Sequence, residues 1–108
     1  FVMRATELVI KNISNSEYGR DEFANDMAMG SSTLYNKVKA TTGQTIVAFI
    51  TSIRMKEAKR ILEGDPDILI NDLAVRVGFN TPKYFSKCFK KEFGIFPKEF
   101  AEQMQSKG

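Results

Sequence analysis

LAVRVGFNTPKYFSKCFKKEFGIFPKEF, residues 73–100, is the stretch of the chain that decides the fold. It repeats the pattern of residues 23–49, which read FANDMAMGSSTLYNKVKATTGQTIVAF. Ala24 aligns with Ala74, an offset of 50 residues. The turn of the second copy has one extra residue, so the offset is 51 from there on. Each copy has the pattern of two short helices joined by a turn. A duplicated helix-turn-helix unit predicts two similar elements that bind a repetitive partner, and duplex DNA is the natural candidate.

The rest of the chain also carries helix signals. No Asn-Gly hairpin turn occurs and alternating apolar runs are few, so we predict an all-α fold with seven helices. The predicted helices are residues 2–13, 21–28, 32–42, 45–62, 70–77, 81–93 and 97–103. We expect one domain, residues 1–108, that contains a first helix-turn-helix unit (1–43), a linker helix (45–62) and a second helix-turn-helix unit (68–105).

Capping residues define the ends of the predicted helices. An N-cap side chain accepts a hydrogen bond from the backbone at the start of a helix. We expect this role for Asp21, Thr45 and Thr81. Gly43 and Gly94 stand just past the third and sixth helices, where a left-handed residue ends a helix. The linker helix has apolar residues at a period of about 3.6, so we expect it to tie the two units together.

Positive charge is concentrated in the second unit. The net charge of the chain is only +3. Residues 83–98, however, hold five lysines and one acid, Glu92, whereas residues 1–50 hold equal numbers of basic and acidic side chains. This local excess of positive charge predicts contact with a polyanion.

The composition argues against catalysis, a cofactor and a membrane span. The chain has no histidine, no phosphate-binding loop and no nucleophile beside a visible base. No apolar run approaches the ~20 residues that cross a bilayer. The single cysteine, Cys88, excludes an internal disulfide and is typical of a protein in a reducing cytoplasm. Its place on the apolar side of helix 81–93 predicts a small core residue.

Helices 32–42 and 81–93 each carry a polar stripe without an acid. Steps of about 100° per residue place four side chains on one side of each helix. These side chains are Ser32, Tyr35, Asn36 and Lys39 in the first copy, and Lys83, Ser86, Lys87 and Lys90 at the matching positions of the second. A carboxylate in such a stripe would repel phosphate, so its absence favours DNA binding.

The stripe residues have the chemistry needed to read a DNA groove. Lys83 and Lys87 can donate to guanine, and Asn36 can pair with adenine. We expect adaptable contacts to bases or phosphates from Ser32, Tyr35 and Ser86, and phosphate contacts from Lys39, Lys90 and Lys91.

Other interpretations remain open at this point. Any helix has a polar outer face, and the same fold can serve as a helical protein- or RNA-interaction module. Neither stripe, however, is apolar enough for a strong protein hot spot. Phenylalanines interleaved with lysines can stack on single-stranded bases, but the helical spacing in the second unit favours core packing. These residues are Phe79, Phe85, Phe89, Phe93, Phe96 and Phe100.

Basic residues also lie on the linker helix. Arg54, Lys56, Lys59 and Arg60 are expected to form a solvated face, with Glu57 and Glu63 as partners. Packing of Arg54 between the two units is the alternative.

Two runs resemble the DNA-binding domain of AraC/XylS-type transcription regulators. They are DLAxxVGFxxxxYFSKxFKKxFGxxPxxF, from Asp72 to Phe100, and GQTIVAFITSIRMKEAKRIL, from Gly43 to Leu62. The resemblance implies seven helices, two helix-turn-helix units, and insertion of the third and sixth helices into major-groove segments. It also implies transcriptional control, usually activation through RNA polymerase.

The resemblance further implies which residues read bases. They fall on Ser31, Ser32, Tyr35, Asn36, Lys83, Tyr84, Ser86 and Lys87. Members of the family usually carry an additional domain for sensing, dimerisation or phosphoryl reception. The start at Phe1 fits an excised C-terminal effector domain, for example of a hybrid two-component sensor-regulator.

Three positions depart from the family pattern. Ala28 stands where glycine is common in the first turn, so we expect either a shift of the turn toward Gly30 or strain of about 1 kcal/mol at Ala28. Phe96 stands where serine or threonine usually caps the last helix; we expect loss of that cap to cost ~1 kcal/mol, offset by burial of the ring. Ala101 stands where an arginine is frequent.

Overall fold

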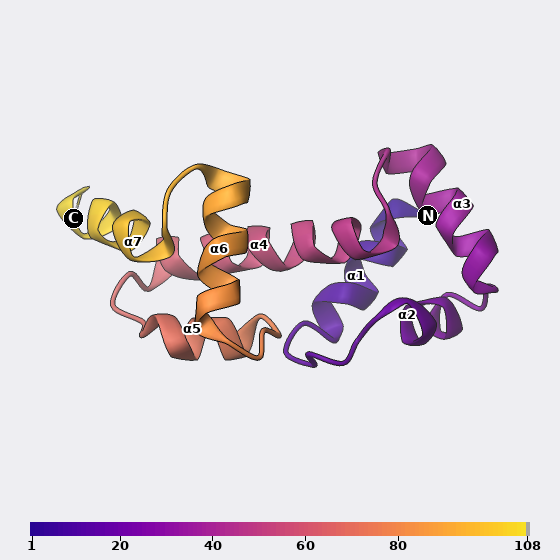
Figure 1. Cartoon of the computed structure of the whole chain (residues 1–108), viewed down its shortest axis with the longest axis horizontal. Helices are drawn as coiled ribbons and strands as arrows, with labels where there is room; N and C mark the ends of the chain where they lie inside the picture. Colours follow the sequence, from indigo (N-terminus) through magenta and orange to yellow (C-terminus); the bar gives the residue numbers. More distant parts are fainter. Residues whose placement is uncertain (108) are drawn as a thin grey trace.

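The longest helix, α4, runs along the long axis of the molecule and joins two groups of three shorter helices (Figure 1). The computed structural model describes residues 1–107, and within this range it has seven helices and no strand. The helices are α1 (Val2–Lys11), α2 (Arg20–Asp26), α3 (Ser31–Thr42), α4 (Ile46–Gly64), α5 (Ile70–Arg76), α6 (Pro82–Phe93) and α7 (Pro97–Lys107). The predicted all-α fold with seven helices is confirmed.

α4 supplies apolar side chains to two separate cores. Thr45 caps its start, because the Oγ1 atom accepts a hydrogen bond from the N–H of Ala48 at 3.1 Å. The first core takes Ile46, Phe49, Ile50 and Ile53 from α4, and the second takes Met55, Ala58, Ile61 and Leu62. Because one continuous helix contributes to both cores, it limits how far the two groups of helices can move relative to each other.

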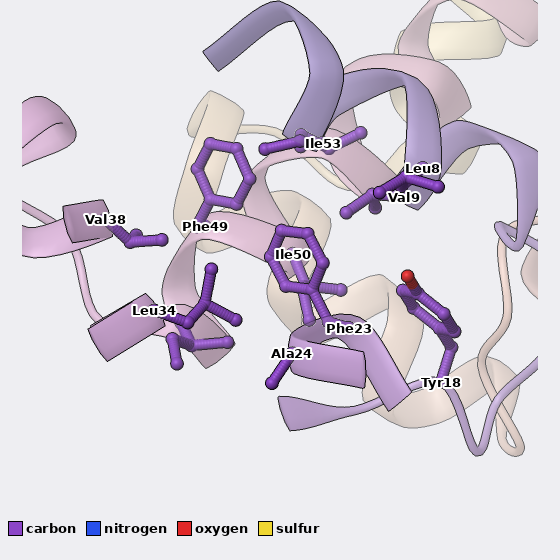
Figure 2. Packing of buried hydrophobic residues seen from close by; sticks show 12 residues of the cluster. Leu8, Val9, Tyr18, Phe23, Ala24, Leu34, Val38, Phe49, Ile50 and Ile53 are labelled. Atoms are coloured by element: carbon purple, nitrogen blue, oxygen red, sulfur yellow. The ribbon is translucent and has the colours of Figure 1, made fainter. Parts of the chain in front are cut away.

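The first core turns one side of α3 inward. Phe23 of α2 stacks on Phe49 of α4, with ring centroids 6.1 Å apart and planes 2° from parallel. Leu34 and Val38 of α3 point toward this pair and are fully buried (Figure 2). The opposite side of α3 is therefore left to solvent.

Aromatic rings fill the second core and orient α6. Phe85 and Phe89 of α6 are fully buried. Phe85 lies edge-on to Phe79 at a centroid distance of 5.5 Å, and Phe89 lies edge-on to Phe100 at 5.8 Å. Core packing of these four phenylalanines is confirmed, and it fixes which side of α6 faces outward.

Phe96 does not follow the expectation of a buried ring. It is 43% exposed, and the Nζ atom of Lys90 lies 4.4 Å from the centroid of its ring. The ring therefore forms a cation–π contact at the surface. Its burial cannot offset the missing cap of α7, and that part of the prediction was wrong.

The start of α2 also differs from the prediction. Gly19 occupies the N-cap position, and its N–H donates to a carboxylate oxygen of Glu22 at 3.1 Å. Asp21 lies within the first turn and does not cap the helix. The other helix ends also shift: α1, α2 and α5 end earlier than predicted, at Lys11, Asp26 and Arg76, and α4 and α7 continue to Gly64 and Lys107.

Arg54 is not part of a solvated face. It is only 5% exposed, and its guanidinium donates to the backbone carbonyl oxygens of Ile13, Asn15 and Val77. The alternative, that Arg54 packs between the two units, is correct. Arg60 does lie at the surface, where it pairs with Glu57.

Candidate nucleic-acid interface

The outer side of α3 carries the polar stripe expected from the sequence. Ser32, Tyr35, Asn36 and Lys39 are all exposed, whereas Leu34 and Val38 are buried. α3 starts at Ser31, one residue earlier than predicted, and Ser31 is half-buried. The burial pattern of α3 therefore leaves hydrogen-bonding side chains and one lysine free to meet a ligand.

The outer side of α6 has the same arrangement with more charge. Thr81 caps the helix, because its Oγ1 atom accepts from the N–H of Tyr84 at 3.2 Å, and Pro82 occupies the first turn. The exposed residues of this side are Lys83, Lys87, Lys90 and Lys91, and Ser86 is half-buried among them. Within residues 1–107, none of these lysines forms an ion pair with a carboxylate. Their charge therefore stays available for an anionic partner.

One shallow hollow gathers the predicted base readers of the first unit. It has a volume of about 390 Å³ and is lined by Ser31, Ser32, Tyr35, Asn36 and Arg20. Sequence reasoning missed Arg20, because α2 had been predicted to begin one residue later. The signal that could have found it is a basic residue at the start of the helix that precedes a recognition helix.

Arg20 brings positive charge to this hollow and has an acidic neighbour outside its lining. Its Nε atom lies 3.9 Å from Oδ1 of Asp21, and both side chains are largely exposed. The Oγ atom of Ser31 also lies 3.4 Å from Oδ1 of Asp21. A surface pair of this kind is weak and exchanges readily. The guanidinium of Arg20 can therefore turn from Asp21 to a phosphate oxygen, which it can bind in a bidentate manner.

A second hollow lies beside α6 and gathers four of the predicted residues. It has a volume of about 550 Å³ and is lined by Tyr84, Lys87, Cys88, Lys90, Lys91 and Phe96. Tyr84 is 60% exposed, and its ring rests on Phe79 at a centroid distance of 5.7 Å. Lys39, Lys83 and Ser86 line neither of the two hollows.

Other kinds of site are not found among the described residues. Within residues 1–107, no group of three or more His, Cys, Asp or Glu side chains is placed to hold a metal ion. No helix in the same range has the length and apolar character that a membrane crossing requires.

Two exposed, acid-free helix faces on paired helix-turn-helix units define a DNA-binding class of protein. In agreement with this, residues 23–103 match the family described as "Helix-turn-helix domain". The chain belongs to this family and, within it, to the AraC-type domains that bind DNA in a sequence-specific manner in transcription regulators.

Curated relatives include longer proteins. The chain is 38% identical over 97 residues to Histidine kinase P4 of Formosa agariphila, covering 90% of this chain and 7% of that protein. It is 34% identical over 90 residues to the HTH-type transcriptional activator RhaS of Mannheimia succiniciproducens, covering 83% of this chain and 33% of that protein. This chain therefore spans a third or less of both relatives.

Solved structures with the same fold include a domain of a response regulator and a domain of a global transcriptional factor. The C-terminal domain of AraT, a response regulator from Geobacillus stearothermophilus, is 29% identical, with a TM-score of 0.84 over 94% of this chain and 84% of that one. The DNA-binding domain of AdpA, solved with a target DNA, has a TM-score of 0.87 over 97% and 93%. At 18% identity, AdpA supports the fold alone.

Proposed function

We propose that this chain regulates transcription by inserting α3 and α6 into two successive major-groove segments of one DNA duplex. The observation that supports this most strongly is the matched burial of the two helices. Each buries its apolar side and exposes an acid-free polar side. Two such faces on one chain match the repetition of the DNA grooves.

The dimensions of the molecule agree with this mode of binding. α4 has 19 residues, which at about 1.5 Å per residue gives a length of about 28 Å. Major-groove faces on one side of B-DNA recur about every 34 Å. The long axis of the molecule is 46 Å, and both α3 and α6 run across this axis (Figure 1). The two helices can therefore reach neighbouring groove segments without bending of the chain.

The proposal assigns a role to each predicted residue. Base reading is assigned to Ser31, Ser32, Tyr35, Asn36, Lys83, Tyr84, Ser86 and Lys87. Phosphate contact is assigned to Lys39, Lys90 and Lys91, and we add Arg20 to this group. Exposure of the lysine ammonium groups supports these roles, because a phosphate contact requires a charge that the fold has not already neutralised.

The properties of the longer protein are also proposals. We expect the full chain to carry a sensory, dimerisation or receiver domain, since the relatives of this chain are several times longer or more. We further expect contact with RNA polymerase and a cytoplasmic location, where a bacterial regulator meets its DNA. We expect no catalysis by this segment.

Selection of bound duplexes from a random DNA pool tests the proposal. The selected duplex then competes against a scrambled duplex, single-stranded RNA and heparin at about 150 mM salt. We expect the selected duplex to bind at least ~1000-fold more tightly than the scrambled one. Equal affinity for the two duplexes would leave only non-specific binding, and stronger binding to RNA would favour an RNA-interaction module.

A further inference from the structure

The buried guanidinium of Arg54 joins backbone segments from both helix-turn-helix units. Its Nη1 atom donates to the carbonyl oxygen of Ile13 at 2.6 Å and to that of Val77 at 2.7 Å. Its Nη2 atom donates to the carbonyl oxygen of Asn15 at 3.0 Å. Ile13 and Asn15 follow α1 in the first unit, and Val77 ends α5 in the second. A single side chain of α4 therefore holds the two units together.

Backbone carbonyl oxygens, rather than a carboxylate, meet the positive charge of Arg54, and burial lowers the pKa of its guanidinium. Within residues 1–107, Arg54 forms no ion pair. Its carbonyl partners lie at or just beyond the C-terminal ends of α1 and α5, where the helix dipole places partial negative charge. Burial of an unpaired cation is costly, so this arrangement exists only when both helix ends are in position. The contact thus depends on the relative placement of the two units.

The neighbouring residues are shaped to fit this contact. Gly78 has a φ of 85°, and a Cβ atom there would overlap both Nη1 of Arg54 and the carbonyl oxygen of Ile13. The side chain of Ile13 packs against both hydrophobic cores. The turn of the second unit, the segment after α1 and the middle of α4 therefore meet at one point.

We infer that Arg54 is a positioning residue that sets the distance and rotation between α3 and α6, and so determines the spacing between the two half-sites that the chain recognises. The inference rests on the proposed function, because spacing matters only if both helices bind one duplex. Each added base pair turns the second half-site by roughly 34° about the helix axis. Two rigidly joined readers therefore tolerate one spacing, whereas loosely joined readers tolerate several.

The test compares spacing profiles of Arg54→Lys and Arg54→Met with that of the unchanged chain. The DNA set contains the selected duplex, versions with one base pair removed or added between the half-sites, and a duplex with a single half-site. Arg60→Met is the matched control, because Arg60 lies on the same helix, pairs with Glu57 and has no carbonyl partner in the other unit. Helicity by circular dichroism identifies the variants that fold.

For the unchanged chain and Arg60→Met, we expect affinity to fall at least ~10-fold when the spacing changes by one base pair. For Arg54→Lys and Arg54→Met, we expect single-half-site affinity within about twofold of normal, with a ~10-fold loss on the selected duplex and a flattened spacing profile. A lysine keeps the positive charge but can donate to fewer carbonyl oxygens than arginine, whereas methionine donates to none. Arg54→Lys should therefore show a smaller effect than Arg54→Met.

Two results would overturn the inference while leaving DNA binding intact. One is an unchanged chain that binds the two-half-site duplex tightly at every spacing. The other is a folded Arg54 variant whose profile is as sharp as that of the unchanged chain. If the unchanged chain preferred no duplex at all, the proposed function itself would fail and the inference with it.

Discussion

The guanidinium of Arg54 occupies the space that a side chain on Gly78 would need. The equivalent position in the first unit is Ala28, which has a φ of 56° and is exposed. Both turns thus place a residue in the left-handed region, so the first turn does not shift and Ala28 takes the conformation for which the strain is expected. The first turn has room for the alanine side chain, because position 28 is exposed to solvent. In the second turn, the contact with Arg54 requires glycine.

Opposite effects on stability follow for the two turns. We expect Gly78→Ala to lower the free energy of unfolding by about 2–4 kcal/mol, from the left-handed backbone and the overlap with Arg54. We expect Ala28→Gly to raise it by up to about 1 kcal/mol, because relief of strain exceeds the added chain entropy. Urea denaturation measures both changes. A Gly78→Ala variant as stable as the unchanged chain would contradict the packing of Arg54 against this turn.

Lys87 tests the base-reading face of α6. We expect Lys87→Ala to weaken binding to the selected duplex by ~1–3 kcal/mol and to relax the preference at one base pair, since the lysine is exposed and we propose that it donates to guanine. Titration against duplexes with single base changes measures the effect. Lys56→Ala is the matched control, because it removes the same charge from a residue outside α6. Lys56 lines a groove between α1 and α4. A loss of equal size in both variants would indicate an effect of net charge alone.

Lys91 tests the phosphate contacts. We expect Lys91→Ala to weaken binding to selected and scrambled duplexes by a similar factor and to reduce the slope of log affinity against log salt by about 1. Lys91→Arg should restore the slope, because it keeps the charge. If Lys91→Ala changed only the affinity for the selected duplex, Lys91 would be a base reader.

Tyr18 gives the stability of the fold a dependence on alkaline pH. Burial, together with a 2.9 Å hydrogen bond to Asp26, raises the pKa of Tyr18 above its ordinary value of 10.0. The unfolded chain therefore releases this proton first, so the stabilisation is complete below about pH 10 and is lost as the pH rises toward the folded-state pKa. Urea denaturation from about pH 8 to about pH 11 should show a smaller decline for Tyr18→Phe. Tyr35→Phe, which alters an exposed ring, should decline as the unchanged chain does.

Local sequence rules predicted most of the fold because the decisive signals are short-range. Thr45 and Thr81 accept the backbone hydrogen bonds expected of N-cap residues, and Gly43 and Gly94 end their helices in the left-handed conformation. The apolar period correctly predicted which side of α3 and of α6 faces the core, but Cys88 and Phe93, both expected in the core, are only half-buried. The same rules failed at Asp21, because Gly19 and Glu22 satisfy the start of α2 in its place.

The parts that were missed depend on contacts between different elements of the fold rather than on the pattern within one helix. Arg54 lies 41 positions from Ile13 and 23 from Val77, so its burial follows from the assembled fold rather than from its neighbours on α4. Phe96 follows α6, and its exposed ring meets the ammonium group of Lys90 across the turn that ends this helix. Arg20 joins the first hollow only because α2 and α3 are packed together.

Removal of single bases from the selected duplex, followed by separation of bound from free DNA, tests the central claim most directly. The account predicts two clusters of required bases, about ten base pairs apart on one face of the duplex. Asn36→Ala should remove the requirement for a base in one cluster, and Lys87→Ala the requirement for a base in the other. A single cluster, sensitive to only one of these substitutions, would show that one unit alone reads DNA and would contradict the account.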